Sequence, residues 1–331
     1  MDANYIGTPE DITMDVGLTI PTRGPLATPQ GVEAFARRAE ELDFTHLAVP
    51  DHVVVPRSID SRYPYSATGE FPGAASGACL DQFTLLAFVA AINTTARLLT
   101  SVTVIPHRGA VHTAKTVATI DVLSKGRMIL GVGAGWMKEE FEALGAPAFE
   151  ARGRVTDEYL QAFKQLWTED DPRFDGDHVK FANITFLPKP EQKPHPPIWV
   201  GGESAAALRR TARYGDTWFP IGNNPRHPLD TLERFAQGCA NMRAVAEKHN
   251  RNPQSIGLAF FANWFDENKS MNTPDGQRLL LTGNSEQIAE DIHGLKDLGV
   301  RDLILNFQRD TLEQSLASMQ HFAETIRPLT T

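Results

Sequence analysis

The chain has 331 residues, 41% of them hydrophobic and 22% charged, a composition usual for globular proteins that excludes a mainly disordered or fibrous chain. Asp and Glu total 41 against 32 Lys and Arg, a net charge of −9, so no general nucleic-acid-binding surface is expected, because phosphate-backbone affinity needs clustered cations. The two cysteines, Cys79 and Cys239, lie far apart without a CxxC partner, which argues against a disulfide framework and a thiolate zinc site.

Short β-rich runs alternate with longer helical patterns along the chain, which is typical of a parallel sheet wrapped by helices. The first predicted strand is Asp15–Pro21, and Thr28 and Pro29 then offer an N-cap and an N1 position for a helix that reaches Leu42. The elements expected next are a strand over His46–Pro50, a helix over Asp81–Asn93, a strand over Leu98–Pro106, a helix over Thr113–Leu123 and a strand over Arg127–Val132.

A broken helical region then reaches Glu169, and the segment Pro172–Pro197 interrupts the alternation with a predicted hairpin over Val179–Phe186 and a proline-rich end. The last helix is marked by Thr311 and Gln314, which have capping-box spacing. Between these segments the pattern predicts strands over Ile198–Gly202, Thr217–Ile221, Ile256–Ala262 and Asp302–Phe307, and helices over Ser204–Tyr214, Leu229–His249 and Ser285–Leu298.

Eight strands, each followed by a helix, predict an α/β fold of the (β/α)8 TIM-barrel type. Insertions are expected over about residues 53–77, after the second strand, and 172–197, before the fifth. We expect residues 1–331 to form one domain; the alternative is a doubly wound sheet in two domains, but no linker divides the chain. Active sites of such barrels lie where strands run into helices, so motifs at strand ends are the candidates.

Asp51 and His52 directly follow the second predicted strand. An imidazole beside a carboxylate is a usual acid/base or hydrogen-bonding pair, although a histidine that only caps a loop would give the same pattern. A metal site is less expected, because the chain has no HxH or HExxH spacing.

Small residues mark three other strand ends. The run Thr100–Pro106 either allows a planar ligand to approach or packs inside the barrel. The run Gly131–Gly135 implies a backbone close to something flat, but Trp136 stands where a dinucleotide fingerprint needs its third glycine, so we reject a Rossmann site. The run Gly201–Ser204 precedes a helix and suits a phosphate, although a tight turn with a serine cap would look the same.

Taken in this order and spacing, these residues resemble the luciferase-like monooxygenase superfamily, in particular its branch dependent on the deazaflavin coenzyme F420. The resemblance covers nearly the whole chain, from DVGLTIP at 15–21 to DLILNF at 302–307. It rests on PDH at 50–52, TSVTVIP at 100–106, LSKGRMILGVGAGWMKEEFEALG at 123–145, RGRVTDEYL at 152–160, PPIWVGGES at 196–204 and GDTWFP at 215–220. It implies a TIM barrel with a flavin or deazaflavin at its C-terminal face, and usually a homodimer.

The resemblance also implies roles for particular residues. Asp51 and His52 match the pair beside the reactive edge of the cofactor ring, and they are the predicted catalytic residues, with His52 handling a proton. The Ser101–Val102 bond matches a non-prolyl cis peptide that backs the ring. The predicted cofactor-binding set is Asp51, Ser101, Val102, Thr103, Gly133, Ala134, Gly135, Gly201, Gly202, Glu203 and Ser204, of which the last four match the loop that holds the phosphate.

Two positions depart from family patterns. Trp136 stands where sugar-phosphate dehydrogenases of the deazaflavin branch have a catalytic glutamate, which argues against a sugar phosphate and suggests an apolar wall. Ala134 replaces an arginine that meets the flavin phosphate in bacterial luciferase, which favours F420 over FMN. In the first insertion, Arg57, Arg62, Tyr63 and Tyr65 either contact substrate or belong to a solvated loop.

These observations predict an F420-dependent oxidoreductase that transfers a hydride between the deazaflavin and a small organic substrate. The alternatives are an FMN-dependent monooxygenase that uses oxygen and is supplied by a separate reductase, and a flavin-binding barrel without turnover. We expect a homodimer without nucleic-acid or membrane partners. Met1–Thr13 lacks the apolar core of a signal peptide, and the longest apolar run, Leu85–Ile92, is far below the ~20 residues of a membrane span, so a soluble, cytoplasmic protein is expected.

Overall fold

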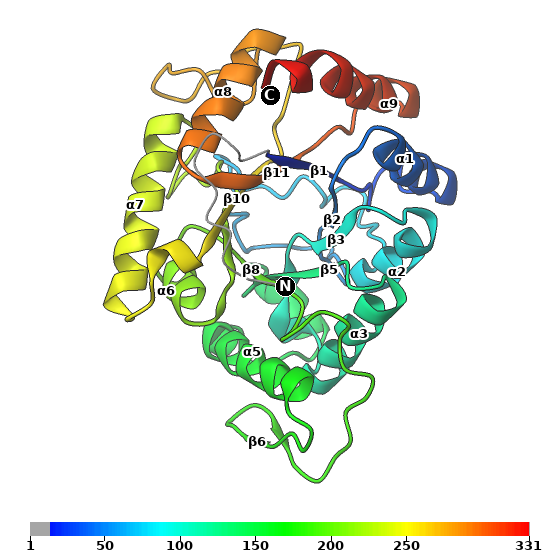
Figure 1. Cartoon of the computed structure of the whole chain (residues 1–331), viewed down its shortest axis with the longest axis vertical. Helices are drawn as coiled ribbons and strands as arrows, with labels where there is room; N and C mark the ends of the chain where they lie inside the picture. Colours follow the sequence, from blue (N-terminus) through cyan, green and yellow to red (C-terminus); the bar gives the residue numbers. More distant parts are fainter. Residues whose placement is uncertain (1–13, 331) are drawn as a thin grey trace.

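The computed structural model describes residues 14–330, and its centre is the predicted closed barrel of eight parallel strands (Figure 1). The barrel closes because its first strand pairs with its last and because its third strand also pairs with its fourth. Met1–Thr13, for which no signal peptide was expected, lies outside the described residues. In chain order the barrel strands are β1 (Asp15–Thr19), β2 (His46–Val49), β3 (Arg97–Thr100), β5 (Met128–Gly133), β8 (Ile198–Gly201), β9 (Thr217–Phe219), β10 (Gly257–Ala262) and β11 (Val300–Leu305).

The helices form an outer ring around these strands (Figure 1). Several begin where the sequence predicts: Thr28 caps α1 with proline next to it, and Thr311 and Gln314 form the expected capping box of α9. The helices are α1 (Pro29–Glu41), α2 (Gln82–Ile92), α3 (Ala110–Leu123), α4 (Lys138–Ala143), α5 (Arg152–Thr168), α6 (Ala205–Tyr214), α7 (Leu232–Lys248), α8 (Ser285–Asp297) and α9 (Leu312–His321), with short 3₁₀ turns at Ile105–His107, Phe149–Ala151, Pro253–Ser255 and Arg327–Thr330 and a π turn at Phe322–Ile326.

Side chains fill the inside of the barrel, so it is a packed core and not a channel. The large apolar layer lies between strands and helices, and a smaller cluster occupies the interior. Because the interior is filled, a ligand has to bind at an end of the barrel. The interior cluster consists of Ala48, Leu99, Ile129, Trp199, Phe219, Ala259 and Ile304, with Val102 and Phe261 packed against it.

The third predicted strand, Leu98–Pro106, is not continuous. The chain leaves the sheet after Thr100, passes through a cis Ser101–Val102 peptide, and pairs with β5 again only over β4 (Thr103–Val104). The predicted cis peptide is therefore confirmed, and the predicted uninterrupted strand is wrong.

The hairpin predicted over Val179–Phe186 lies earlier in the chain than expected. It is formed by β6 (Phe174–Asp175) and β7 (Lys180–Phe181), which pair antiparallel. The Glu158 carboxylate of α5 accepts hydrogen bonds from the backbone N–H groups of residues 177–179 and holds the turn between the two strands. This long-range anchor sets the register, and β-propensity alone does not reveal it.

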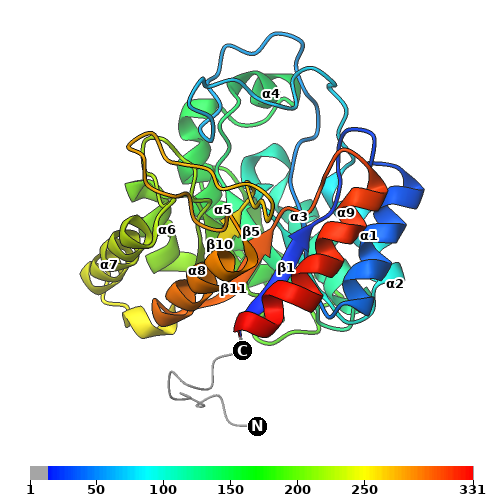
Figure 2. The same cartoon turned by 90° about the horizontal axis from the view of Figure 1, so that it is seen from above.

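Long irregular segments gather at one end of the barrel. Figure 2 shows the segment between β2 and α2, coloured blue, arching over this end together with α4, and the segment between β10 and α8 on the same side. The first of these contains the predicted insertion over residues 53–77. Within residues 14–330, no helix combines the length and apolar character needed to cross a membrane.

Candidate active site

The Asp51 carboxylate, which follows the end of β2, accepts hydrogen bonds from a cationic side chain and from the backbone. Arg108 donates to both of its oxygens at 2.8 Å, and the Val104 N–H donates to Oδ2 at 2.9 Å. Burial lowers the pKa of Arg108, but the hydrogen bonds and charges of Asp51 and Asp81 outweigh it, so that the net pKa is raised. Asp51 therefore joins the end of β2 to the segment after β4.

His52 is paired with a residue that the sequence did not single out. Its Nδ1 lies 2.8 Å from Oε2 of Glu140, a residue of α4. The hydrogen-bond partner of His52 is therefore Glu140 and not the adjacent Asp51. The other oxygen of Glu140 accepts hydrogen bonds from the N–H groups of Val53, at 2.8 Å, and Val54, at 3.3 Å. Burial raises the pKa of Glu140, but these hydrogen bonds and the neighbouring histidines lower it by more than burial raises it. The net pKa is therefore below its usual value.

His107 lies on the other side of the same carboxylate. Its Nδ1 is 3.9 Å from Oε1 of Glu140, and neither ring nitrogen has a hydrogen-bond partner in the described part of the chain. Burial lowers the pKa of His107, against the opposing charges of Glu140 and Asp51. Glu140 is thus a buried anion, 1% exposed, between two imidazoles.

Aromatic side chains surround His52. Its ring centroid lies 4.8 Å from that of Phe71 and 6.3 Å from that of Trp136. Tyr63 packs edge-on against Trp136 at 5.2 Å and contacts Tyr65 at 5.6 Å. The first insertion therefore supplies most of an apolar wall beside His52, as the tryptophan suggested, and the two tyrosines belong to it.

Glycines within β5 and at the end of β8 fit around the Thr100–Val102 segment. A Cβ on Gly133 would lie 2.7 Å from Cγ2 of Val102, and one on Gly201 would lie 3.0 Å from its Cγ1. A Cβ on Gly131 would lie 1.9 Å from the Thr100 carbonyl oxygen. The sequence had suggested that the glycines of the run 131–135 face something flat, and in the structure Gly131 and Gly133 face Thr100 and Val102 of the protein itself.

The segment Gly201–Ser204 forms the predicted strand-to-helix turn. Ser204 caps α6 by accepting a hydrogen bond from the N–H of Ala207 at 3.2 Å, and Gly202 has a φ of +98°. The Glu203 carboxylate accepts hydrogen bonds from the Ile221 N–H, at 2.8 Å, and from Asn224, at 3.0 Å. Burial raises the pKa of Glu203 to about 7 against these hydrogen bonds. Glu203 therefore braces the turn, and the first-turn N–H groups of α6 form the part that suits an anion.

Two cations near the third strand, Arg108 and Lys115, are engaged by other groups of the protein. Arg108 binds Asp51, and Lys115 donates to the Leu187 carbonyl oxygen. A cation that the sequence reading missed, Arg152, donates to the Gly135 carbonyl oxygen at 3.2 Å and has no ion-pair partner among residues 14–330. Its position at the start of α5, after a glycine-rich strand end, was the available signal.

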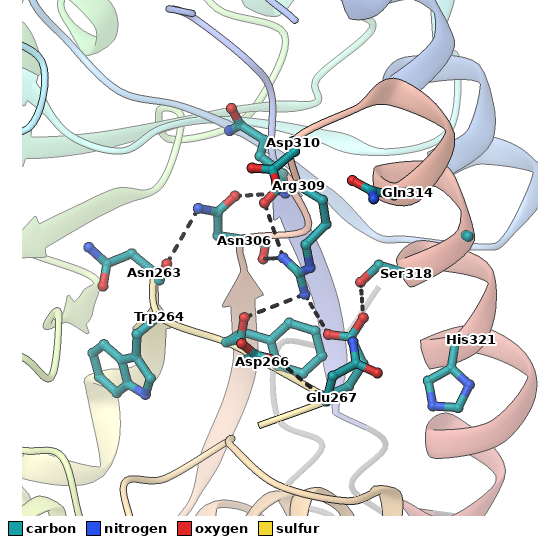
Figure 3. Close-up of a pocket in the computed structure, with 14 residues that line it drawn as sticks. Asn263, Trp264, Asp266, Glu267, Asn306, Arg309, Asp310, Gln314, Ser318 and His321 are labelled. Atoms are coloured by element: carbon teal, nitrogen blue, oxygen red, sulfur yellow. Dashed lines mark hydrogen bonds and ion pairs between the residues drawn. The ribbon is translucent and has the colours of Figure 1, made fainter. Parts of the chain in front are cut away.

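A cavity of about 830 Å³ lies at the ends of β10 and β11 (Figure 3). Its lining is mostly polar and includes Asn263 and Asn306, with Ser318 and His321 from α9. Arg309 donates to Glu267 in its wall, and Figure 3 shows the two side chains meeting there. None of the predicted site residues lines this cavity. Among residues 14–330, no group of three or more His, Cys, Asp and Glu side chains is arranged to hold a metal ion.

Comparison with known proteins gives a consistent picture of the family. A family model described as luciferase-like monooxygenase matches residues 14–265. An FMNH(2)-dependent dimethylsulfone monooxygenase from Pseudomonas putida is 34% identical over 237 residues, which are 58% of this chain and 64% of that protein. The chain thus aligns with just under two thirds of the length of that relative.

Solved structures share the fold across nearly the whole chain. A monooxygenase from Streptomyces bottropensis superposes with a TM-score of 0.72 and 21% identity, covering 95% of this chain and 99% of its own. A coenzyme F420-dependent tetrahydromethanopterin reductase from Methanopyrus kandleri gives a TM-score of 0.70 and 16% identity, covering 96% and 99%. Structures described as a monooxygenase and as an F420-dependent reductase therefore share this barrel.

Proposed function

The chain belongs to the luciferase-like monooxygenase family, and from this premise we propose that it is an oxidoreductase that binds F420 and exchanges a hydride with a small organic substrate. The choice of cofactor rests on how few cations near the predicted cofactor site are free to bind a phosphate. Ala134 supplies no cation, and Arg108 and Lys115 are engaged by Asp51 and Leu187. A terminal dianionic phosphate such as that of FMN is best met by several cations, whereas F420 presents a phosphodiester.

The residues at the barrel mouth fit a ring cofactor with a phosphate. Ser101 Oγ is buried without a hydrogen-bond partner in the described structure, beside the cis peptide, and can bind a polar edge of the ring. The first-turn N–H groups of α6 can bind the phosphate, together with the Arg152 guanidinium. When bound, F420 would accept or donate the hydride.

The protein's own part in the reaction is then positioning and proton transfer. His52 is the only imidazole in the predicted set, and its Nε2 makes no hydrogen bond to the described residues. It can take a proton from a hydroxyl group that is being oxidised, or return one in the reverse direction. Trp136, Phe71 and Tyr63 exclude water from this region and favour an apolar substrate body.

An FMN-dependent monooxygenase is the second candidate, and two observations favour it. The Pseudomonas putida relative uses FMNH(2), and Arg152 is a cation without a carboxylate partner close to the glycine-rich loop. Such an enzyme would receive reduced flavin from a separate reductase and consume oxygen.

Side-by-side titration of the purified protein with F420 and FMN, followed by fluorescence, tests the choice. We expect F420 to bind more tightly, and oxygen uptake with reduced FMN to stay at background. Arg152→Met should weaken cofactor binding by roughly tenfold or more, the value of a charge-assisted hydrogen bond. Arg154→Met, exposed on the same helix, is the matched control. Micromolar FMN binding without F420 affinity would reverse the assignment to the monooxygenase.

We also propose a homodimer that buries the outer face of α2. This helix has no charged residue over Gln82–Ile92, and Phe88 is 46% exposed on it. On the neighbouring α3, Leu123 is 70% exposed. Exposed apolar side chains on two adjacent helices, without charges on the first, suit a self-complementary contact with a second copy of the chain.

A further inference from the structure

Helix α4 holds the first insertion through its two adjacent glutamates. Oε1 of Glu139 accepts hydrogen bonds from the N–H groups of Asp60, at 2.9 Å, and Ser61, at 3.0 Å. Oε1 of Glu140 accepts those of Val53 and Val54. Residues 53–54 and 60–61 are therefore both attached to a helix that lies some eighty residues further along the chain.

Glu140 differs from Glu139 in what its second oxygen does. Oε2 of Glu140 lies 2.8 Å from Nδ1 of His52, whereas Oε2 of Glu139 is buried without a hydrogen-bond partner among the described residues. An ionised carboxylate has no proton to give, so the hydrogen bond requires a proton on Nδ1 of His52. In the neutral imidazole the lone pair is then on Nε2.

We propose that Glu140 is a positioning residue, which fixes His52 in the Nδ1–H tautomer and makes Nε2 the atom that handles the proton. The same carboxylate accepts hydrogen bonds from the N–H groups of Val53 and Val54. The tautomer of His52 and the position of the first insertion over the barrel mouth therefore depend on one side chain. The role of Nε2 in turnover rests on the proposed function; the tautomer and the coupling do not.

In the proposed reaction, this tautomer makes Nε2 the ring nitrogen that exchanges a proton with the substrate. In the oxidation direction a substrate hydroxyl would lose its proton to Nε2 while its carbon gives the hydride to bound oxidised F420, so that a carbonyl and the reduced deazaflavin are formed. His52 then carries a positive charge, which Glu140 stabilises directly through Nδ1. In the reverse direction the same proton returns from Nε2 to the oxygen. His107 is held near the other oxygen of Glu140 and does not hydrogen-bond it.

The tautomer is measured on the full-length protein without cofactor, by nitrogen NMR of the ring after selective labelling of histidine. His52→Asn assigns the resonances. At a pH where His52 is neutral, we expect Nδ1 to appear protonated and Nε2 unprotonated in the wild type. Glu140→Gln has one acceptor oxygen in place of two, so the preference for Nδ1–H should weaken or disappear. Glu139→Gln should leave it unchanged.

Amide hydrogen exchange measures the coupling. Glu140→Gln should speed exchange at Val53 and Val54 by roughly tenfold or more, since hydrogen bonds to a charged carboxylate are replaced by at most weaker ones to a single neutral amide oxygen. Glu139→Gln should speed it at Asp60 and Ser61 while His52 keeps its tautomer. A wild-type His52 protonated on Nε2 would overturn the proposal even if no variant folds, and so would an unchanged tautomer in a folded Glu140→Gln. Neither outcome depends on whether F420 or FMN binds.

Discussion

At the scale of single residues, the proposed chemistry depends on the side chain of His52. We expect His52→Ala to lower turnover by ~10²–10⁴, because a positioned general acid or base contributes this much, while cofactor affinity changes little. Steady-state kinetics and a cofactor titration on the same preparation measure both quantities. If affinity falls and turnover per bound cofactor persists, His52 is a binding residue and not a proton carrier.

Glu203 is the residue whose burial should be visible in the stability of the protein. Its pKa in the folded protein is about 7, above the ordinary 4.5, so the folded state binds more protons than the unfolded state between these values. Stability from this group is fully present below about pH 4.5 and is lost as pH rises through 7.

Glu203→Gln should therefore gain stability relative to the wild type as the pH rises from 4.5 to 8. The gain approaches roughly 3 kcal/mol, because each unit of pKa shift corresponds to about 1.4 kcal/mol. Urea unfolding at a series of pH values measures it. Asp302, whose pKa burial also raises to about 7, contributes equally to both proteins and cancels in the difference. A difference that stays constant with pH would show that the carboxyl is not buried in this way.

At the scale of elements, the contact between β3 and β5 sets the shape of the barrel mouth. Gly131 lies against the Thr100 carbonyl, so a Cβ at this position would collide with a backbone atom. A backbone atom cannot move aside as the end of a flexible side chain can. We expect Gly131→Ala to destabilise the protein by about 1–3 kcal/mol or more, the cost of overpacking. Gly153→Ala, in a helix with its nearest contact at 3.6 Å, is the control and should be neutral or stabilising. Chemical unfolding of the two variants measures the contrast.

Gly133 is the glycine at which the element and the cofactor site meet. Gly133→Ala would push against the Val102 side chain, 2.7 Å from the new Cβ, and so against the segment expected to back the ring. The protein should keep its fold, because a side chain can move where a backbone cannot, but it should bind cofactor at least tenfold more weakly. Unchanged affinity in a folded Gly133→Ala would separate Val102 from the cofactor site.

At the scale of the whole molecule, the exposed face of α2 bears on the oligomeric state. Phe88→Glu places a charge in the proposed dimer contact and should convert a dimer to a monomer without loss of helix content. Light scattering after size-exclusion chromatography, with circular dichroism, measures both. Leu329→Glu, at an exposed apolar residue in the C-terminal 3₁₀ turn, is the control. A wild-type protein that is monomeric at micromolar concentration would contradict the proposed dimer.

The fold could be predicted from the sequence because its determinants are local. Alternating apolar runs, caps such as Thr28 and the box at Thr311 act between residues a few positions apart, and the repeat of eight strand-helix units leaves a barrel as the simplest way to bury them. The end of the third strand and the hairpin were predicted less well, because their contacts come from distant parts of the chain: Gly131 lies against the Thr100 carbonyl, and Glu158 accepts hydrogen bonds from the hairpin turn.

The sequence by itself determined the barrel, its mouth and the family motifs, since these depend on residue type and spacing. Only the tertiary structure decided the partner of each charged group. Asp51 and His52 are adjacent in the chain, yet consecutive side chains near a strand end point to different sides, so one binds Arg108 and the other Glu140. Glu140 lies 88 positions from His52, and only the packing of α4 over the barrel mouth brings its carboxylate there. Hydrogen bonds act over about 3 Å in space, whatever the separation in sequence. The pairing of His52 with Glu140 therefore depends on the tertiary structure and cannot be read from residue spacing.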